Sequence, residues 1–126
     1  MYRVITMTKE DGSSIDVPFL ANAATPFRYK AVFGRDLLVL FQTSFSNGAY
    51  DIDFVTELAY VMAMQAQGKS GGVDLNKISK DDMLIWLEQF DGFELVNKSK
   101  DIIEVYLGNS NISSKEKKKA RKQSEN

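Results

Sequence analysis

The chain lacks the two residue types on which much of enzyme chemistry depends. Its 126 residues include no histidine and no cysteine. Zinc fingers, disulfide frameworks, Cys or Ser-His-Asp nucleophiles and haem with His or Cys ligation are therefore excluded for this chain alone. General acid or base chemistry would fall to carboxylates, Lys or Tyr, which are less usual choices near pH 7.

The carboxylates form one close group along the chain. Asp51, Asp53 and Glu57 could hold a hard cation or act as an acid/base pair. They also stand at the predicted start of a helix, where capping and the helix dipole favour acidic side chains. Asp81 and Asp82 stand in the first turn of another predicted helix, where the dipole favours them in the same way. We favour the capping interpretation, and we predict a non-catalytic protein with no catalytic residue, no metal and no cofactor.

Two short motifs are similar to ligand-binding loops, but their residues do not have the spacing that those loops require. Gly68-Lys69-Ser70 matches the end of a phosphate-binding loop, yet the required earlier glycine is replaced by Ala63 and the preceding residues are helical in pattern. Asp74, Asn76 and Asp82 do not follow the twelve-residue calcium pattern, and no Glu closes the loop. The segment 68–72 is therefore predicted to be a linker.

Apolar side chains are the more informative candidates for function. Met62 and Met64, with Tyr60 beside them, could line a groove for an apolar helical client, since unbranched polarisable side chains suit variable partners. Trp86 and Phe90 could serve as anchors in the same client-binding surface. Core filling is the simpler interpretation of all five, and both interpretations remain open at the level of sequence.

The elements that must position these residues follow from hydrophobic periodicity. Residues 2–8 and 14–18 alternate as strands around Asp11-Gly12, which predicts a tight hairpin. Helical spacing then recurs after each capping signal. The first predicted helix starts after Thr25 and ends at Gly34, and the second covers residues 37–45 after the cap at Asp36. The third begins at Asp51 or Asp53 and ends near Gln67. The last two cover residues 80–90, after the cap at Ser79, and residues 93–107.

This order predicts the fold class and the domain organisation. We expect an α+β, mostly helical fold, in which an N-terminal β-hairpin is followed by a compact bundle of about four or five helices. The 44% apolar and 26% charged residues are typical of a soluble globular protein. Residues 1–109 are expected to form a single globular domain. No signal peptide is apparent, and the longest apolar run, 58–64, is too short to span a membrane.

Charge divides the chain into an acidic body and a basic tail. Residues 115–126 hold six basic and two acidic residues, and residues 1–114 hold ten basic and fifteen acidic ones. Because the segment 110–126 has no large apolar residue after Ile112, we expect a flexible C-terminal tail. The alternative function is that of a small nucleic-acid-binding regulator that uses this tail. The acidic body would repel a polyanion, so nucleic acid is not the partner we favour.

One segment carries a family resemblance. Residues 24–38, Ala-Thr-Pro-Phe-Arg-Tyr-Lys-Ala-Val-Phe-Gly-Arg-Asp-Leu-Leu, resemble the tail assembly chaperones of long-tailed phages and prophages of Gram-positive bacteria. In that family a short N-terminal hairpin precedes a helix with Phe-Arg-Tyr-Lys, an aromatic-Gly turn and an Asp-Leu-Leu start. The hairpin, Trp86-Leu87 and the Lys/Ser-rich terminus extend the resemblance over essentially the whole chain.

The resemblance implies a function without covalent chemistry. Proteins of this family bind the tape measure protein and keep it soluble until tail tube subunits polymerise around it, they form homo-oligomers, and they are absent from the mature virion. It therefore implies work in the host bacterial cytoplasm. It also implies a longer, frameshifted form that recruits the tail tube protein, and Lys117, Lys118 and Lys119 mark the region whose codons would slip.

Overall fold

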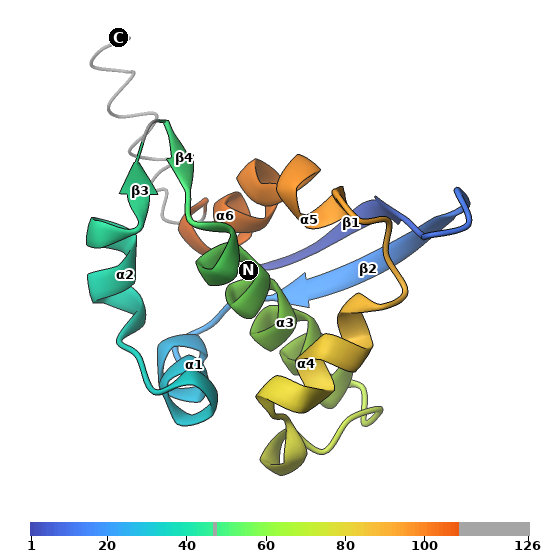
Figure 1. The fold of residues 1–126 in the computed structure, drawn as a ribbon. Helices are drawn as coiled ribbons and strands as arrows, with labels where there is room; N and C mark the ends of the chain where they lie inside the picture. Colours follow the sequence, from blue (N-terminus) through green and yellow to red (C-terminus); the bar gives the residue numbers. More distant parts are fainter. Residues whose placement is uncertain (47, 109–126) are drawn as a thin grey trace, which may run out of the picture.

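The chain forms an antiparallel hairpin followed by a helical body, which confirms the predicted α+β, mostly helical fold. The computed structural model describes residues 1–46 and 48–108 (Figure 1). The predicted tail 110–126, with its Lys117–Lys119 run, lies outside the described residues. The elements are β1 (Tyr2–Thr8), β2 (Ser14–Leu20), α1 (Thr25–Phe33), α2 (Leu37–Thr43), β3 (Phe45–Ser46), β4 (Ala49–Tyr50), α3 (Ile52–Lys69), the 3-10 helix η1 (Leu75–Lys77), α4 (Lys80–Leu87), α5 (Glu94–Asn97) and α6 (Ser99–Leu107).

The N-terminal hairpin has one buried face and one exposed face. Its register pairs Tyr2 with Leu20 and Thr8 with Ser14. Since side chains alternate along a strand, one set points into the protein and the other points to solvent. The inward set includes Ile5, Met7, Val17 and Phe19, all of which are buried. The hairpin is therefore held by packing on the helices, which a two-stranded sheet needs for stability.

Helix α3 is the centre of the fold. It crosses the middle of the molecule in Figure 1 and packs against β2, α1 and α6. Every residue from Leu58 to Ala66 is buried, as expected for a helix that is apolar over most of its circumference. Small residues such as Ala59 and Ala63 face neighbouring elements without leaving room for solvent. The core therefore surrounds this one helix.

The predicted helix starts are confirmed at three positions. The Asp36 carboxylate accepts hydrogen bonds from the first turn of α2, Asp51 accepts one from the Asp53 N–H, and Ser79 accepts one from the Asp82 N–H. These side chains satisfy donors that a helix leaves unpaired at its start. Gly34 ends α1 with a φ of 74°, a left-handed conformation that glycine adopts without strain.

Thr25 does not cap α1, and this part of the prediction is wrong. Ala24 holds the capping position without a side-chain bond, and Thr25 itself begins the helix. The Thr25 side chain is buried instead and accepts a hydrogen bond from Gln65 of α3 at 2.9 Å. The hydroxyl oxygen also accepts a hydrogen bond from the Asn22 N–H at 3.0 Å, so its two donors lie outside the first turn of α1.

Three helix boundaries also differ from the prediction. Helix α2 ends at Thr43, because Phe45–Ser46 pairs with Ala49–Tyr50 as a second hairpin. Helix α4 ends at Leu87, because the backbone at Gln89 and Asp91 bonds to Glu10 and Thr8 at the end of β1. The last predicted helix is divided into α5 and α6 at Lys98. The described residues thus hold six α-helices, where the prediction was four or five.

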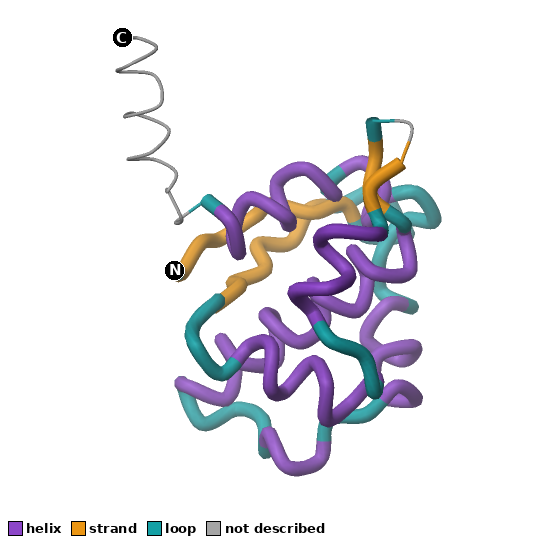
Figure 2. The backbone as a smooth tube through the Cα atoms, turned by 90° about the vertical axis from the view of Figure 1, so that its left-hand side faces the viewer, coloured by secondary structure: helices purple, strands orange, loops and turns teal. Residues whose placement is uncertain are grey.

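The β3–β4 hairpin projects beyond the helices. In Figure 1 it stands with α2 on the side away from the β1–β2 turn, and the turned view of Figure 2 shows the same projection. Within the part of the chain that the structure describes, no helix combines the length and apolarity needed to cross a membrane.

Candidate functional site

Three of the acidic residues considered for a catalytic or metal site, Asp51, Glu57 and Asp82, have structural partners. Among residues 1–46 and 48–108, no group of three or more His, Cys, Asp or Glu could hold a metal ion. Asp51 accepts from the start of α3, and Asp82 accepts from the Tyr60 hydroxyl at 2.7 Å. Burial and this bond raise the pKa of Tyr60. The capping prediction is therefore confirmed for Asp51, whereas the Asp82 carboxylate bonds to a tyrosine of α3 and does not cap a helix.

Glu57 is a buried carboxylate that joins two helices and a turn. It accepts hydrogen bonds from the Tyr29 hydroxyl of α1 and from the Arg35 guanidinium, and it is 6% exposed. Burial, together with the bond to Glu57, raises the pKa of Tyr29 well above its usual range. A buried charge is tolerated only when it is paired and hydrogen-bonded. We therefore assign Glu57 to the stability of the α1–α3 contact.

The residues predicted from sequence as a client-binding surface lie mostly in the core. Tyr60, Met62, Met64 and Phe90 are each at most 5% exposed, and Trp86 is half-buried against the rings of Tyr60 and Phe90. Their large apolar area is covered by the chain's own helices and hairpin. The folded chain offers four of the five no open surface, which corrects the groove interpretation of Met62 and Met64.

A different apolar surface is open to solvent. No Asp, Glu, Lys or Arg occurs between Asp36 and Asp51, the segment that forms α2 and the β3–β4 hairpin. Within it Leu38 is 60% exposed, Val39 51% and Phe45 52%. Single exposed apolar residues are ordinary, but an uncharged surface segment with several of them is typical of an interaction site. We call α2 and the β3–β4 hairpin together the uncharged arm.

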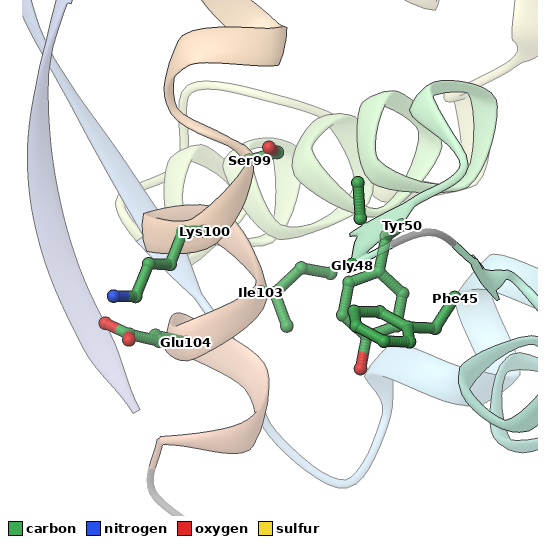
Figure 3. A pocket seen from close by; sticks show the side chains of 8 residues that line it. Phe45, Gly48, Tyr50, Ser99, Lys100, Ile103 and Glu104 are labelled. Carbon is green, nitrogen blue, oxygen red and sulfur yellow. The ribbon is translucent and has the colours of Figure 1, made fainter.

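An open groove lies between the uncharged arm and α6. Its volume is about 390 Å³, within the range of about 300–1,000 Å³ that ligand pockets occupy. Figure 3 shows Ile103 pointing from α6 toward Tyr50, while Lys100 and Glu104 point to the other side of α6. The lining residues are Phe45, Gly48, Ala49 and Tyr50 of the arm, and Ser99, Lys100, Ile103 and Glu104 of α6. The groove thus has apolar walls and charged flanks.

Aromatic rings hold the two walls of the groove together. Phe45 contacts Tyr50 edge-on at 4.9 Å between ring centroids, and Phe41 of α2 contacts Phe54 of α3 at the same separation. Phe41 also stacks on Tyr106 of α6 at 5.3 Å and nearly parallel. Aromatic pairs of this kind prefer defined separations and angles. The packing of Phe41 against Phe54 and Tyr106 therefore holds the arm beside α6.

The segment that carries the family resemblance is largely used by the fold. Tyr29 bonds to Glu57, Arg28 bonds to Gln65 at 3.0 Å, Gly34 ends α1, and Asp36 caps α2. Among its large apolar side chains, Phe27 and Leu38 are exceptions, because they are 75% and 60% exposed. Most residues of the motif therefore serve packing, capping and turn formation in the fold.

Sequence reasoning missed the groove, although one signal pointed toward it. The absence of charge between Asp36 and Asp51 is visible in the sequence, but α6 follows much later in the chain and its position beside the arm is not. Comparison of the chain with protein-family models, with curated proteins and with solved structures finds no match.

Proposed function

We propose that this protein is a non-catalytic tail assembly chaperone of a phage or prophage, which binds the tape measure protein and keeps it soluble in the host bacterial cytoplasm. The observation that carries the proposal is the uncharged arm, whose exposed Leu38, Val39 and Phe45 offer an apolar surface. A long amphipathic helical client needs its apolar stripe covered until its own assembly partners arrive. Such masking makes and breaks no covalent bond.

The family resemblance supplies the identity of the client, and the arm supplies a physical means of binding it. Other apolar side chains, including Phe27 and Phe93, are also well exposed. A protein that coats a long client uses several apolar contacts, and self-association along the client would multiply weak ones. We extend the proposal to homo-oligomers on the client, to a frameshifted form that recruits the tail tube protein, and to absence from the mature virion.

Co-expression with the client tests the proposal. The product of the very long gene expected beside this one is expressed alone, with the wild-type chain, and with the Leu38→Ser/Val39→Ser variant. Wild type should raise the soluble fraction of the client and co-purify with it, and the variant should do so less. The matched control is Leu84→Ser/Ile85→Ser, which removes equally exposed apolar side chains from α4. Unchanged insolubility of the client with wild type would contradict the proposal.

A further inference from the structure

The outer edge of β1 presents a row of main-chain donors and acceptors. In an antiparallel pair, every second residue exchanges hydrogen bonds with the partner strand, and the residues between them direct their N–H and C=O groups away from it. The Lys9 N–H bonds to the Ser13 carbonyl, and the Ala21 N–H bonds to the Met1 carbonyl. The odd-numbered residues therefore bond across the hairpin. The even-numbered residues of β1 direct their main-chain groups outward, and they are Tyr2, Val4, Thr6 and Thr8.

One end of this edge is closed by the chain itself. The Thr8 N–H donates to the Glu94 carboxylate, and the Thr8 carbonyl accepts from the Asp91 N–H at 3.0 Å. Among residues 1–46 and 48–108, no hydrogen bond joins the outward main-chain groups of Val4 or Thr6 to another element. In Figure 3 the violet β1 ribbon is the outermost element on its side of α6. The stretch from Tyr2 to Thr6 is therefore an open edge.

The other edge of the hairpin is protected against an added strand. Pro18 stands at an outward position of β2 and has no N–H to donate. The Leu20 carbonyl, at the next outward position, accepts from the Gln65 amide at 2.8 Å. Natural proteins close sheet edges by such means, because an open edge pairs with other chains. The open stretch of β1 has no proline, and the side chains on its solvent face are uncharged.

We propose that two copies of the chain pair through this edge, antiparallel and around a two-fold axis at Val4, so that their hairpins form one continuous sheet. Val4 then pairs with Val4 of the second copy, and Tyr2 of each copy pairs with Thr6 of the other. Each of these pairs exchanges two main-chain hydrogen bonds. The pairing ends at Thr6, before the position that Glu94 and Asp91 fill.

The sequence of the open stretch matches a second copy of itself. Its donors and acceptors are spaced evenly about Val4, so the same strand in reverse direction supplies a partner for each of them. Val with Val and Tyr with Thr are favourable cross-strand pairs, and no like charges stand opposite each other on the solvent face. Tyr2 is 61% exposed and Val4 47%, so both have apolar area left to bury in the dimer.

The inference goes beyond the proposed function, because the pairing needs no client. It names a surface for the self-association that the proposal includes. A two-fold pairing of this kind closes on itself, so it makes a dimer from which any larger assembly would have to be built through another surface.

Sedimentation velocity of the purified full chain over a range of concentrations tests the pairing. Wild type should shift with rising concentration from the mass of one chain, 14.2 kDa, toward twice that mass. Val4→Lys should raise the dissociation constant of the dimer about tenfold or more, because two like charges would stand directly opposite each other. Val4→Glu should do the same for the same reason.

Mixing these two variants is the decisive measurement. Each variant alone should be monomeric at a concentration where wild type is dimeric. An equal mixture should dimerise, because opposite charges then face each other across the axis. This recovery is specific to a surface on which Val4 faces Val4, and it also shows that both variants fold. In addition, the amide protons of Val4 and Thr6 should exchange slowly in the wild-type dimer and rapidly after dilution.

Val96→Lys is the matched control. Val96 lies on α5 and is 51% exposed, close to the 47% of Val4. Its replacement places the same charge at an equally exposed valine outside the β1 edge, and it should leave the dissociation constant of the dimer unchanged. Circular dichroism and thermal unfolding check that every variant remains folded.

Several results would overturn the pairing. These are a wild-type chain that stays monomeric at every concentration, a dimer that Val4→Lys and Val96→Lys weaken equally, and a mixture of the two Val4 variants that stays monomeric. Amide protection at Val4 and Thr6 that appears only with added peptides of the tape measure protein would assign the edge to an extended client strand instead. Failure to solubilise the client, with the dimer intact, would refute only the proposed function.

Discussion

The Oε2 atom of Glu94 in α5 accepts a hydrogen bond from the backbone N–H of Thr8 in β1 at 2.8 Å, although the two residues are 86 positions apart in the sequence. The same oxygen pairs with the Lys98 ammonium at 2.9 Å. A strand edge otherwise exposes unpaired backbone groups. Glu94, which is 2% exposed, therefore closes the edge of β1 at Thr8 and joins the hairpin to the C-terminal helices.

Glu94→Gln should make stability less dependent on acid pH. Burial alone would raise the pKa of Glu94, but the bonds from Lys98 and Thr8 hold it below its ordinary value of 4.5. The stabilisation is therefore complete above the unfolded pKa and is lost as pH falls through the folded one. At pH 7 the variant should be less stable by about 1–3 kcal/mol, and the difference should narrow below pH 4.5. Urea unfolding across this pH range measures it.

Glu88→Gln is the matched control for that experiment. Glu88 is exposed and has no ion pair within the described residues. Its replacement should change the free energy of unfolding by less than about 0.5 kcal/mol at every pH. Parallel loss of stability by wild type and Glu94→Gln between pH 7 and pH 3 would contradict the role of the Glu94 carboxylate.

Arg35→Met should destabilise the fold by about 1–3 kcal/mol, because the buried Glu57 carboxylate loses its charged donor. Adding Glu57→Gln should recover part of this loss, since no buried charge then remains. A double-mutant cycle in urea gives the coupling between the two residues. Arg3→Met is the comparison, because its ion pairs with Asp101 and Glu104 are long and exposed. Equal costs at Arg35 and Arg3 would argue against the buried pair.

Gln65→Leu should cost about 1–3 kcal/mol, because the Gln65 amide bonds to the Leu20 carbonyl and the Thr25 hydroxyl in a buried site. The variant leaves both oxygens without this donor. Gln67→Leu, two residues later in the same helix and less deeply buried, should be nearly neutral. Thermal unfolding of both variants is the measurement, and similar midpoints would contradict the network.

Gly34→Ala tests the left-handed end of α1. The φ of 74° at Gly34 strains any residue with a Cβ, although no atom lies within 4 Å of the added methyl group. We expect a loss of about 1 kcal/mol. Gly92→Ala also has open space around it but no positive φ, and it should be neutral or slightly stabilising. A neutral Gly34→Ala in urea unfolding would show that α1 can end differently.

Met62→Ala separates core packing from client binding. Met62 is fully buried, so its truncation should cost about 2–5 kcal/mol through lost apolar contact and a residual cavity. Client binding per folded molecule should be unchanged at a temperature where the variant is still folded. Leu38→Ser should change the stability little and weaken client binding, because the Leu38 side chain is 60% exposed. Reduced binding by folded Met62→Ala would return the client site to α3.

The sequence by itself determined the local elements of this protein. The Asp11-Gly12 turn, the caps at Asp36, Asp51 and Ser79, and the stop at Gly34 were all predicted and are all present. Each depends on backbone groups within a few residues of the side chain concerned. The sequence also predicted that α3 would be covered, either inside the bundle or by a partner, because residues 58–66 are apolar over nearly the whole circumference of the helix.

Only the tertiary structure decided which apolar residues became core and which became surface. Met62 and Leu38 are both apolar, but α1, β2 and α6 pack around α3, whereas Leu38 on α2 is 60% exposed. The Thr25 hydroxyl accepts a hydrogen bond from Gln65 instead of capping α1. Residues 48–50 line the groove together with Ile103 of α6. These partners are far apart in the sequence, so local periodicity carries no signal for them. Their proximity follows from packing the whole chain around one helix.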